Sequence, residues 1–176
     1  MPPAAVKTVR DLVYWEYAKL ASEIAVGDRK NFRYAMATYQ RYRRISVHPL
    51  SILHENGLES KGLGECCYCG SQQNLQMDYI VPVSAGGPDR PDNLIDICDK
   101  CRQSKGKKEL FHWFGKERRY EIPRLILGKY LKLVFEAHEA NGTLDSTDVN
   151  KDGKLDIFDL GAAFPKRSKG RPDRAV

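Results

Sequence analysis

Two short cysteine motifs, Cys66-Cys-Tyr-Cys69 and Cys98-Asp-Lys-Cys101, decide the fold of this chain. Each Cys-x-x-Cys turn brings two sulfur atoms to the same side of a tight loop, so the two motifs together supply four thiolates for one tetrahedral zinc ion. Four protein ligands leave no open position on the metal, which is typical of a structural site. The alternative is a pair of disulfides, which is disfavoured because nothing marks the chain as secreted. Cys67 falls outside the spacing and is interpreted as a bystander thiol.

The segment between the two motifs is longer than that of a compact zinc ribbon, which has about 15 to 20 residues there, so it leaves room for an inserted hairpin. It contains Asp78-Tyr-Ile-Val-Pro82, then Gly86-Gly87, then Asn93-Leu-Ile95. This order resembles the HNH, or ββα-metal, nuclease family over roughly residues 66–108. In that family Asp-His-Ile-x-Pro lies on the first strand, a Gly-Gly turn follows, Asn-Leu enters the second strand, and Cys-x-x-Cys opens a helix. The resemblance implies an α+β fold in which a zinc-braced ββα-metal core is flanked by N- and C-terminal helices.

Two positions depart from the family pattern, and both carry functional groups in the family. Tyr79 stands where the family's histidine acts as general base, and Arg102 stands where a metal-binding His or Asn usually follows the last cysteine. A tyrosine has an ordinary pKa near 10 and is a poor base at neutral pH unless a nearby cation lowers that value. A Tyr-for-His variant is known among HNH restriction enzymes that cut DNA, and this sequence is similar to it at Tyr79. The sequence leaves open whether the site is active.

The resemblance implies a metal-dependent HNH endonuclease that hydrolyses phosphodiester bonds in DNA, with Mg²⁺ or Mn²⁺ as the catalytic cation. The expected catalytic residues are Asp78 as ligand of the cation, Tyr79 as base or as orienter of the nucleophile, Asn93 as support, and Arg102 as clamp on the scissile phosphate. The expected partner is double-stranded DNA, and a homodimer is a further expectation because many such nucleases act as homodimers. The alternative is a non-catalytic, zinc-containing nucleic-acid-binding protein that keeps the fold.

Basic side chains give the chain a formal charge of +6 and a sequence pI near 9.0, which fits a polyanionic partner. Much of this charge lies in the tail that follows residue 165, which is interpreted as a solvated end. Two further sets are expected to contact nucleic acid: Arg41, Arg43 and Arg44 in the tyrosine-containing run 39–44, and Lys105, Lys107 and Lys108 after the last cysteine. The alternative for the first set is an ordinary solvated helix face.

A second metal motif lies near the C-terminus, in residues 148–159. Oxygen-bearing side chains recur there at the spacing of an EF-hand-type calcium loop, and Gly153 stands at the sharp turn. The predicted calcium ligands are Asp148, Asn150, Asp152, Lys154 through its carbonyl, Asp156 and Asp159. The loop resembles the dockerin form, in which Asp replaces the usual final Glu. Because the sequence shows only one such loop, it is expected to brace the chain rather than to act as a regulatory sensor.

Apolar spacing predicts helices over about residues 9–25, 29–45, 108–120 and 123–140, with a linker before the cysteine region. We therefore expect a helical N-terminal region (1–60), a zinc-bound nuclease module (61–110), C-terminal helices (111–143), the calcium loop (144–165) and a basic tail (166–176). No stretch approaches the roughly 18 apolar residues of a membrane span, and no signal peptide is recognisable, so a cytoplasmic protein without a membrane partner is expected.

Overall fold

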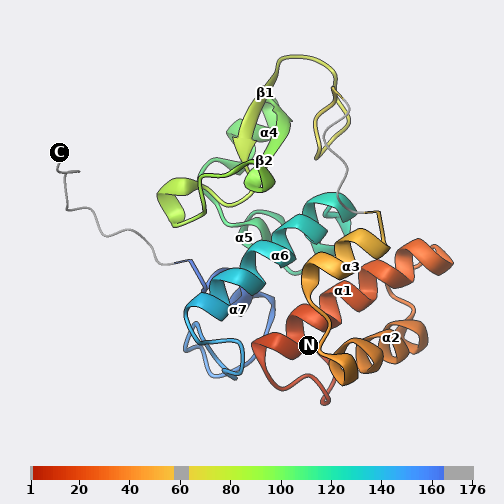
Figure 1. Cartoon of the computed structure of the whole chain (residues 1–176). Helices are drawn as coiled ribbons and strands as arrows, with labels where there is room; N and C mark the ends of the chain where they lie inside the picture. Colours follow the sequence, from red (N-terminus) through yellow and green to blue (C-terminus); the bar gives the residue numbers. More distant parts are fainter. Residues whose placement is uncertain (1, 58–63, 165–176) are drawn as a thin grey trace.

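The chain folds into a helical body that carries a small two-stranded sheet at one end, as the computed structural model of residues 2–57 and 64–164 shows (Figure 1). The helices are α1 (Val9–Val26), α2 (Phe32–Ile45), α3 (Pro49–Glu55), α4 (Asp99–Lys105), α5 (Leu110–Phe114), α6 (Arg124–Ala140) and α7 (Ile157–Gly161). The strands are β1 (Leu75–Tyr79) and β2 (Leu94–Cys98), and short 3₁₀ turns occur at Val83–Ala85, Pro91–Asn93 and Arg119–Glu121. Within the described residues, no helix has the length and apolar character that crossing a bilayer requires.

Helix α1 is the centre of the body, because side chains on nearly all of its faces are buried. It begins at the N-cap Thr8, whose hydroxyl accepts from the Asp11 N–H, and ends at Gly27, where a φ of 72° favours glycine. Helices α2, α6 and α7 pack against it. The Tyr17 hydroxyl donates to the Gly128 carbonyl of α6 over 2.9 Å, which satisfies a polar group in the middle of the apolar core.

The two strands pair antiparallel, with Asp78 opposite Ile95 and Tyr79 opposite Leu94. Helix α4 follows β2 directly, so the segment has the order strand, strand, helix that the resemblance implied. Ile80 and Ile95 reach the core of the helical body, whereas Ile97 packs with cysteines in a second, smaller cluster. The sheet is therefore joined to the body at the end of β1, which is also where Asp78 and Tyr79 lie.

The predicted helices over residues 9–25, 29–45 and 123–140 are confirmed, with α2 beginning three residues later than expected. The helix predicted over residues 108–120 is wrong in length: α5 ends at Gly115, whose φ is 75°. Helix α3 lies in the predicted linker, where Pro49 occupies its first turn. The boundary expected at residues 60 and 61 and the basic tail at 166–176 lie outside the described residues.

Candidate metal centre and the neighbouring site

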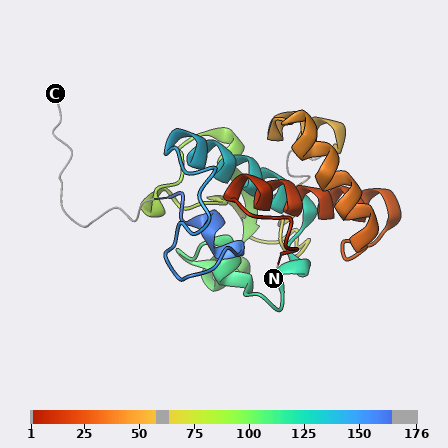
Figure 2. The ribbon, with the colours of Figure 1, turned by 90° about the horizontal axis from the view of Figure 1, so that it is seen from below.

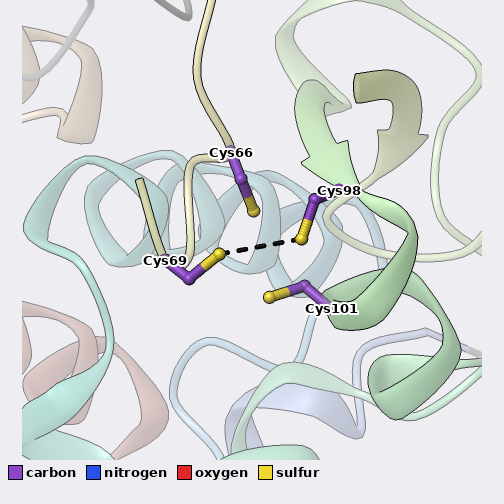
Figure 3. Close-up of side chains that lie close together, drawn as sticks. All are labelled: Cys66, Cys69, Cys98 and Cys101. Carbon is purple, nitrogen blue, oxygen red and sulfur yellow. Dashed lines mark hydrogen bonds between the residues drawn. The ribbon is translucent and has the colours of Figure 1, made fainter. Parts of the chain in front are cut away.

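Four thiols from two distant parts of the chain converge on one point (Figure 3). The Sγ atoms of Cys66, Cys69, Cys98 and Cys101 all lie within 4.8 Å of one another, and those of Cys69 and Cys98 are 3.7 Å apart. Thiolates around a tetrahedral zinc, with Zn–S bonds of about 2.3 Å, lie about 3.8 Å apart, so the cluster has the size of a zinc shell. A disulfide needs an S–S distance of about 2.05 Å, and all five cysteines are free thiols.

Backbone hydrogen bonds hold the first cysteine motif against the sheet. The Gly70 N–H donates to the Cys66 carbonyl over 2.8 Å and closes the turn, and Gly70 has the positive φ of 73° that glycine adopts readily. The Cys67 N–H donates to the Asp96 carbonyl of β2 over 2.9 Å. Cys67 itself is outside the thiol cluster and packs against the main core, as expected for a bystander.

The second cysteine motif is placed by secondary structure. Cys98 ends β2 and caps α4, and Cys101 lies in the first turn of that helix, on the same side. Burial raises the pKa of Cys66, but backbone hydrogen bonds from Cys98, Tyr68 and Cys69 outweigh it and lower that pKa to about 7. The pKa of Cys101 is instead raised, chiefly by burial, so the four thiols do not ionise alike in the absence of a metal.

Asp78 meets a buried lysine from α4. The Lys105 side chain is 0% exposed, and its Nζ lies 3.5 Å from Asp78 Oδ2 and donates to the Tyr79 carbonyl over 2.7 Å. Burial lowers the pKa of Lys105, while Asp78 opposes that shift. The ammonium group of Lys105, which was predicted to contact nucleic acid, is used inside the protein to hold the end of β1. Sequence reasoning missed this role, since basic residues are usually exposed.

Tyr79 has a carboxylate partner that sequence reasoning also missed. The Tyr79 hydroxyl donates to Asp89 Oδ1 over 2.6 Å. This hydrogen bond to Asp89 raises the pKa of Tyr79, so the phenol keeps its proton at neutral pH. Asp89 lies ten residues away in a loop, and no local spacing in the sequence connects the two residues.

The loop that carries Asp89 is anchored by Asn93, which is fully buried. Its Oδ1 accepts from the Val81 N–H over 2.9 Å, and its Nδ2 donates to the Val81 and Pro88 carbonyls, each over 2.8 Å. A Cβ on Gly87 would lie 2.1 Å from the Val81 carbonyl oxygen, so only glycine fits that position. The Gly-Gly turn and the asparagine therefore hold the loop closed, and Asn93 faces the backbone rather than solvent.

Ion pairs fasten the same loop to α6. Asp92 lies 2.6 Å from Lys132 Nζ and 2.8 Å from Arg90 Nε, and Glu136 pairs with both Arg90 and Lys132. Arg90, Asp92 and Glu136 are all partly exposed. The Asn93 contacts fix the loop from within, and these pairs fix its orientation on the helical body.

The other residues predicted to act on phosphate are exposed. The Arg102 side chain is 48% exposed and lies one turn before Lys105 on α4, with Asp99 3.8 Å away. Lys107 and Lys108 follow α4 at the surface. Arg102 therefore shares a helix face with the lysine that touches Asp78.

The predicted Arg41, Arg43 and Arg44 set lies on α2, at the opposite end of the molecule from β1, β2 and α4 (Figure 1). Arg43 pairs with Asp11 over 3.3 Å, and Arg41 lies 4.0 Å from Glu55. The tyrosines of the run are buried in the core and do not interleave with the arginines on the surface. The structure brings this set into no contact with Asp78 or Tyr79.

The carboxylates of the predicted calcium loop bind backbone N–H groups. Asp148 accepts from Asp152 and Gly153, and the buried Asp159 accepts from Val149, Asn150 and Asp156. Asp156 also pairs with Lys116 over 2.6 Å. Among the described residues, the four cysteines form the group of acidic, histidine or cysteine side chains that lie close enough together to hold a metal, and the loop carboxylates do not form a second such group.

Known proteins match this chain in the segment that contains the cysteines. The HNH endonuclease family model matches residues 66–110. The chain is 40% identical over 53 residues to a CRISPR-associated endonuclease Cas9 of Corynebacterium diphtheriae, covering 28% of this chain and 5% of that protein. It is 33% identical over 69 residues to a Cas9 of Actinomyces naeslundii, covering 37% of this chain and 6% of that protein. No solved structure matches significantly.

The matched stretch is thus a small part of relatives that are far longer than this chain. It contains both cysteine motifs, the two strands and α4, which are the elements that build the thiol cluster and the ends of β1 and β2. Residues 66–110 are thus similar to the HNH endonuclease family model, and they contain the strand, strand, helix order described above.

Proposed function

We propose that this protein is a metal-dependent HNH-type endonuclease that hydrolyses phosphodiester bonds in DNA. The observation that carries the proposal is the group formed by Asp78, Tyr79, Asp89 and Lys105 at the end of β1, on the same small sheet whose other end carries Cys98. A partly exposed phenol, two carboxylates and a buried ammonium group at one strand end suit a reaction that moves a proton beside a phosphate. The family match of residues 66–110 supports the same function.

Asp78 is the residue that would hold a catalytic Mg²⁺ or Mn²⁺. Mg²⁺ is commonly bound by one or two carboxylates together with substrate phosphate oxygens, and Asp78 supplies one carboxylate that is partly exposed. When bound, the cation would neutralise charge that develops on the phosphate. Lys105 positions the Asp78 carboxylate, and Arg102 grips a non-bridging oxygen pair of the phosphate through its guanidinium group.

The Tyr79–Asp89 pair replaces the family's histidine as the group that handles the proton. Because the pKa of Tyr79 is raised, its phenol orients the attacking water rather than deprotonating it. Asp89 Oδ1 accepts from the phenol, and the described residues donate no hydrogen bond to Oδ2, which is left to take the proton of the water. Water oxygen then bonds to phosphorus as the bond to the leaving oxygen breaks.

Cleavage of supercoiled plasmid DNA by the purified, zinc-loaded protein with Mg²⁺ or Mn²⁺ tests the proposal. Tyr79→Phe removes the hydroxyl, and Asp89→Asn removes the proton acceptor, so each should lower the cleavage rate at least about 100-fold. The matched controls are Tyr34→Phe and Asp145→Asn, which change a surface tyrosine and a surface aspartate outside the group. Parental cleavage by both Tyr79→Phe and Asp89→Asn would contradict the roles assigned here.

The second candidate function is a zinc-containing protein that binds nucleic acid without cutting it. It is favoured by the replacement of the family's histidine with a phenol whose pKa is raised. Retention of a DNA fragment in a gel-shift assay, with no cleavage by the parent protein under any divalent cation, would select this candidate. The same assay with single-stranded and double-stranded probes identifies the preferred form.

Two more metal sites and a dimer belong to the proposed function. We propose that zinc is structural at the four thiols, because all four positions of a tetrahedral shell are protein ligands. We also propose that residues 148–159 bind Ca²⁺, which is supported by the spacing of the oxygen-bearing side chains and by the turn at Gly153, with a φ of 87°. A homodimer would let two sites face the two strands of a duplex, and sedimentation analysis with and without DNA tests this.

A further inference from the structure

A cavity of about 540 Å³ lies in the helical body, whose ribbon Figure 2 shows from below. Its walls come from the start of the chain, α1, the beginning of α2, the connection after α5, and residues 154–157. None of its residues belongs to the thiol cluster or to the group around Tyr79. Its volume lies within the range of about 300–1,000 Å³ that is usual for small-molecule sites. We call it the Tyr120 pocket, after a ring that lines it.

Positive charge is concentrated around that ring. Lys19, Lys30 and Arg119 place their charged groups 5.3, 5.2 and 4.6 Å from the centre of the Tyr120 ring. Glu16 compensates Lys19 over 2.7 Å. In the part of the chain that the structure describes, no carboxylate pairs with Lys30 or Arg119. Two uncompensated cations that face one ring in a cavity form an attractive site for an anion.

The pocket also presents an aromatic surface. Phe32 is 59% exposed, which is high for so large an apolar side chain, and Trp15 supports it edge-on with ring centres 5.8 Å apart. A bare phosphate or sulfate would need only the cations. An exposed ring beside them matches a ligand with a flat aromatic part and a phosphate part, because bases stack on aromatic side chains and phosphates bind guanidinium and ammonium groups.

We infer that the Tyr120 pocket binds a nucleotide, with its base against Phe32 and its phosphate at Lys30 and Arg119. The same chemistry is offered by a free nucleotide and by the phosphorylated end of a nucleic-acid strand. The inference does not depend on cleavage, since no residue of the proposed nuclease site lines the pocket. A strand end held there would add a contact remote from Tyr79.

Titration calorimetry on the full, zinc-loaded chain tests the inference with four probes: ADP, inorganic pyrophosphate, and a short single-stranded oligonucleotide with or without a 5′-phosphate. Fluorescence provides a second signal. The sequence has two tryptophans, Trp15 and Trp113, so a Trp113→Phe background leaves Trp15 in the pocket as the reporter. Binding of ADP and of pyrophosphate is expected. If the oligonucleotide with a 5′-phosphate binds tightly and the one without it does not, the natural ligand is the phosphorylated end of a strand.

Three variants separate the parts of the site. Arg119→Ala and Lys30→Ala should each weaken both ADP and pyrophosphate about tenfold, because a charge-assisted contact is lost. Phe32→Leu should weaken ADP about fivefold or more and leave pyrophosphate unchanged, because it removes only the stacking surface. The matched controls are Arg118→Ala, next in sequence but outside the pocket, and Lys7→Ala, and both should bind as the parent does.

A melting temperature equal to that of the parent protein would show that a variant keeps its fold. The inference is overturned if neither ADP nor the phosphorylated strand binds saturably below millimolar concentration. It is also overturned if Arg119→Ala binds ADP as tightly as Arg118→Ala. Equal loss of ADP and pyrophosphate in Phe32→Leu would remove the nucleobase from the assignment and so reject a nucleotide as the ligand.

Discussion

Asn93 connects the end of β1 to the loop that carries Asp89 through three hydrogen bonds to backbone groups. Replacement by alanine leaves the buried N–H of Val81 without an acceptor, and each such loss costs about 1–3 kcal/mol. We expect Asn93→Ala to lower the free energy of unfolding by about 3 kcal/mol, as measured by urea denaturation. Asn93→Asp should destabilise similarly, because its carboxylate cannot donate to the two carbonyls. Exposed Gln73→Ala is the control, and parental stability of both Asn93 variants would contradict the anchoring role.

His138 makes the stability of the fold depend on pH. It is buried on α6, with Nε2 3.1 Å from the Leu160 carbonyl and Nδ1 2.8 Å from the Thr143 hydroxyl. Burial lowers its pKa, although Leu160 and Asp159 oppose the shift. The unfolded chain, in which histidine titrates near pH 6.5, thus binds the proton more readily than the folded one, so stability is lost as the pH falls below about 6.5.

The melting temperature should therefore fall between pH 7.5 and pH 5.5, and His138→Gln should reduce that fall because it removes the titrating group. His54→Gln, at an exposed position, is the control and should keep the parental fall. An undiminished fall in His138→Gln would show that other groups cause the pH dependence.

At the scale of elements, the loop of residues 148–159 offers a test of the proposed cation site. Asp159 already satisfies three backbone N–H groups and Asp156 pairs with Lys116, so the turn has internal support. If the loop also binds Ca²⁺, saturating Ca²⁺ should raise the melting temperature, because an ion that binds only the folded state stabilises that state. Asp148→Ala with Asp152→Ala should abolish the rise. An unchanged melting temperature from micromolar to millimolar Ca²⁺ would rule the site out.

Elements whose formation depends on local spacing could be predicted from the sequence, and those that depend on distant partners could not. The Cys-x-x-Cys spacing predicted the thiol cluster because a turn and a helix start each fix two sulfur atoms. The helix predicted over residues 108–120 is too long because Gly115 ends α5. Helix α3 is not predicted, because Pro49 is typical of a linker as well as of a first helical turn. The contacts of Asp89 with Tyr79 and of Lys105 with Asp78 could not be predicted, because they depend on how the loop, β1 and α4 pack together.

At the scale of the whole molecule, two apolar clusters of unequal size share the chain. The larger one joins the helices with Ile80, Val81 and Ile95, whereas the smaller one consists of Cys66, Ile97 and Cys98 with a few partly buried neighbours. A cluster that small cannot fold its surroundings alone, and structural zinc supplies about 10–16 kcal/mol of apparent free energy in small modules. The thiol end of the sheet should therefore depend on zinc, and the helical body should not.

Removal of zinc with a strong chelator tests that division. Hydrogen exchange measured by mass spectrometry should speed up in residues 66–78 and 95–105, while α1 and α6 keep their protection. Cys69→Ser should reproduce the pattern, and Cys67→Ser, outside the cluster, is the matched control. Loss of protection throughout the chain would show that the molecule folds as one zinc-dependent unit, and no change anywhere would show that zinc has no structural role.

The ion pairs between Arg90, Asp92, Lys132 and Glu136 link the Asp89 loop to α6 at a partly solvent-accessible surface. Mobile ions screen such pairs, with a Debye length that falls from about 10 Å at 0.1 M to about 3 Å at 1 M. Concentrated electrolyte therefore weakens the attachment of the loop as well as any attraction for a polyanion. A drop in turnover at high ionic strength would combine both effects, and only single-turnover rates at saturating enzyme would isolate the contribution of the loop.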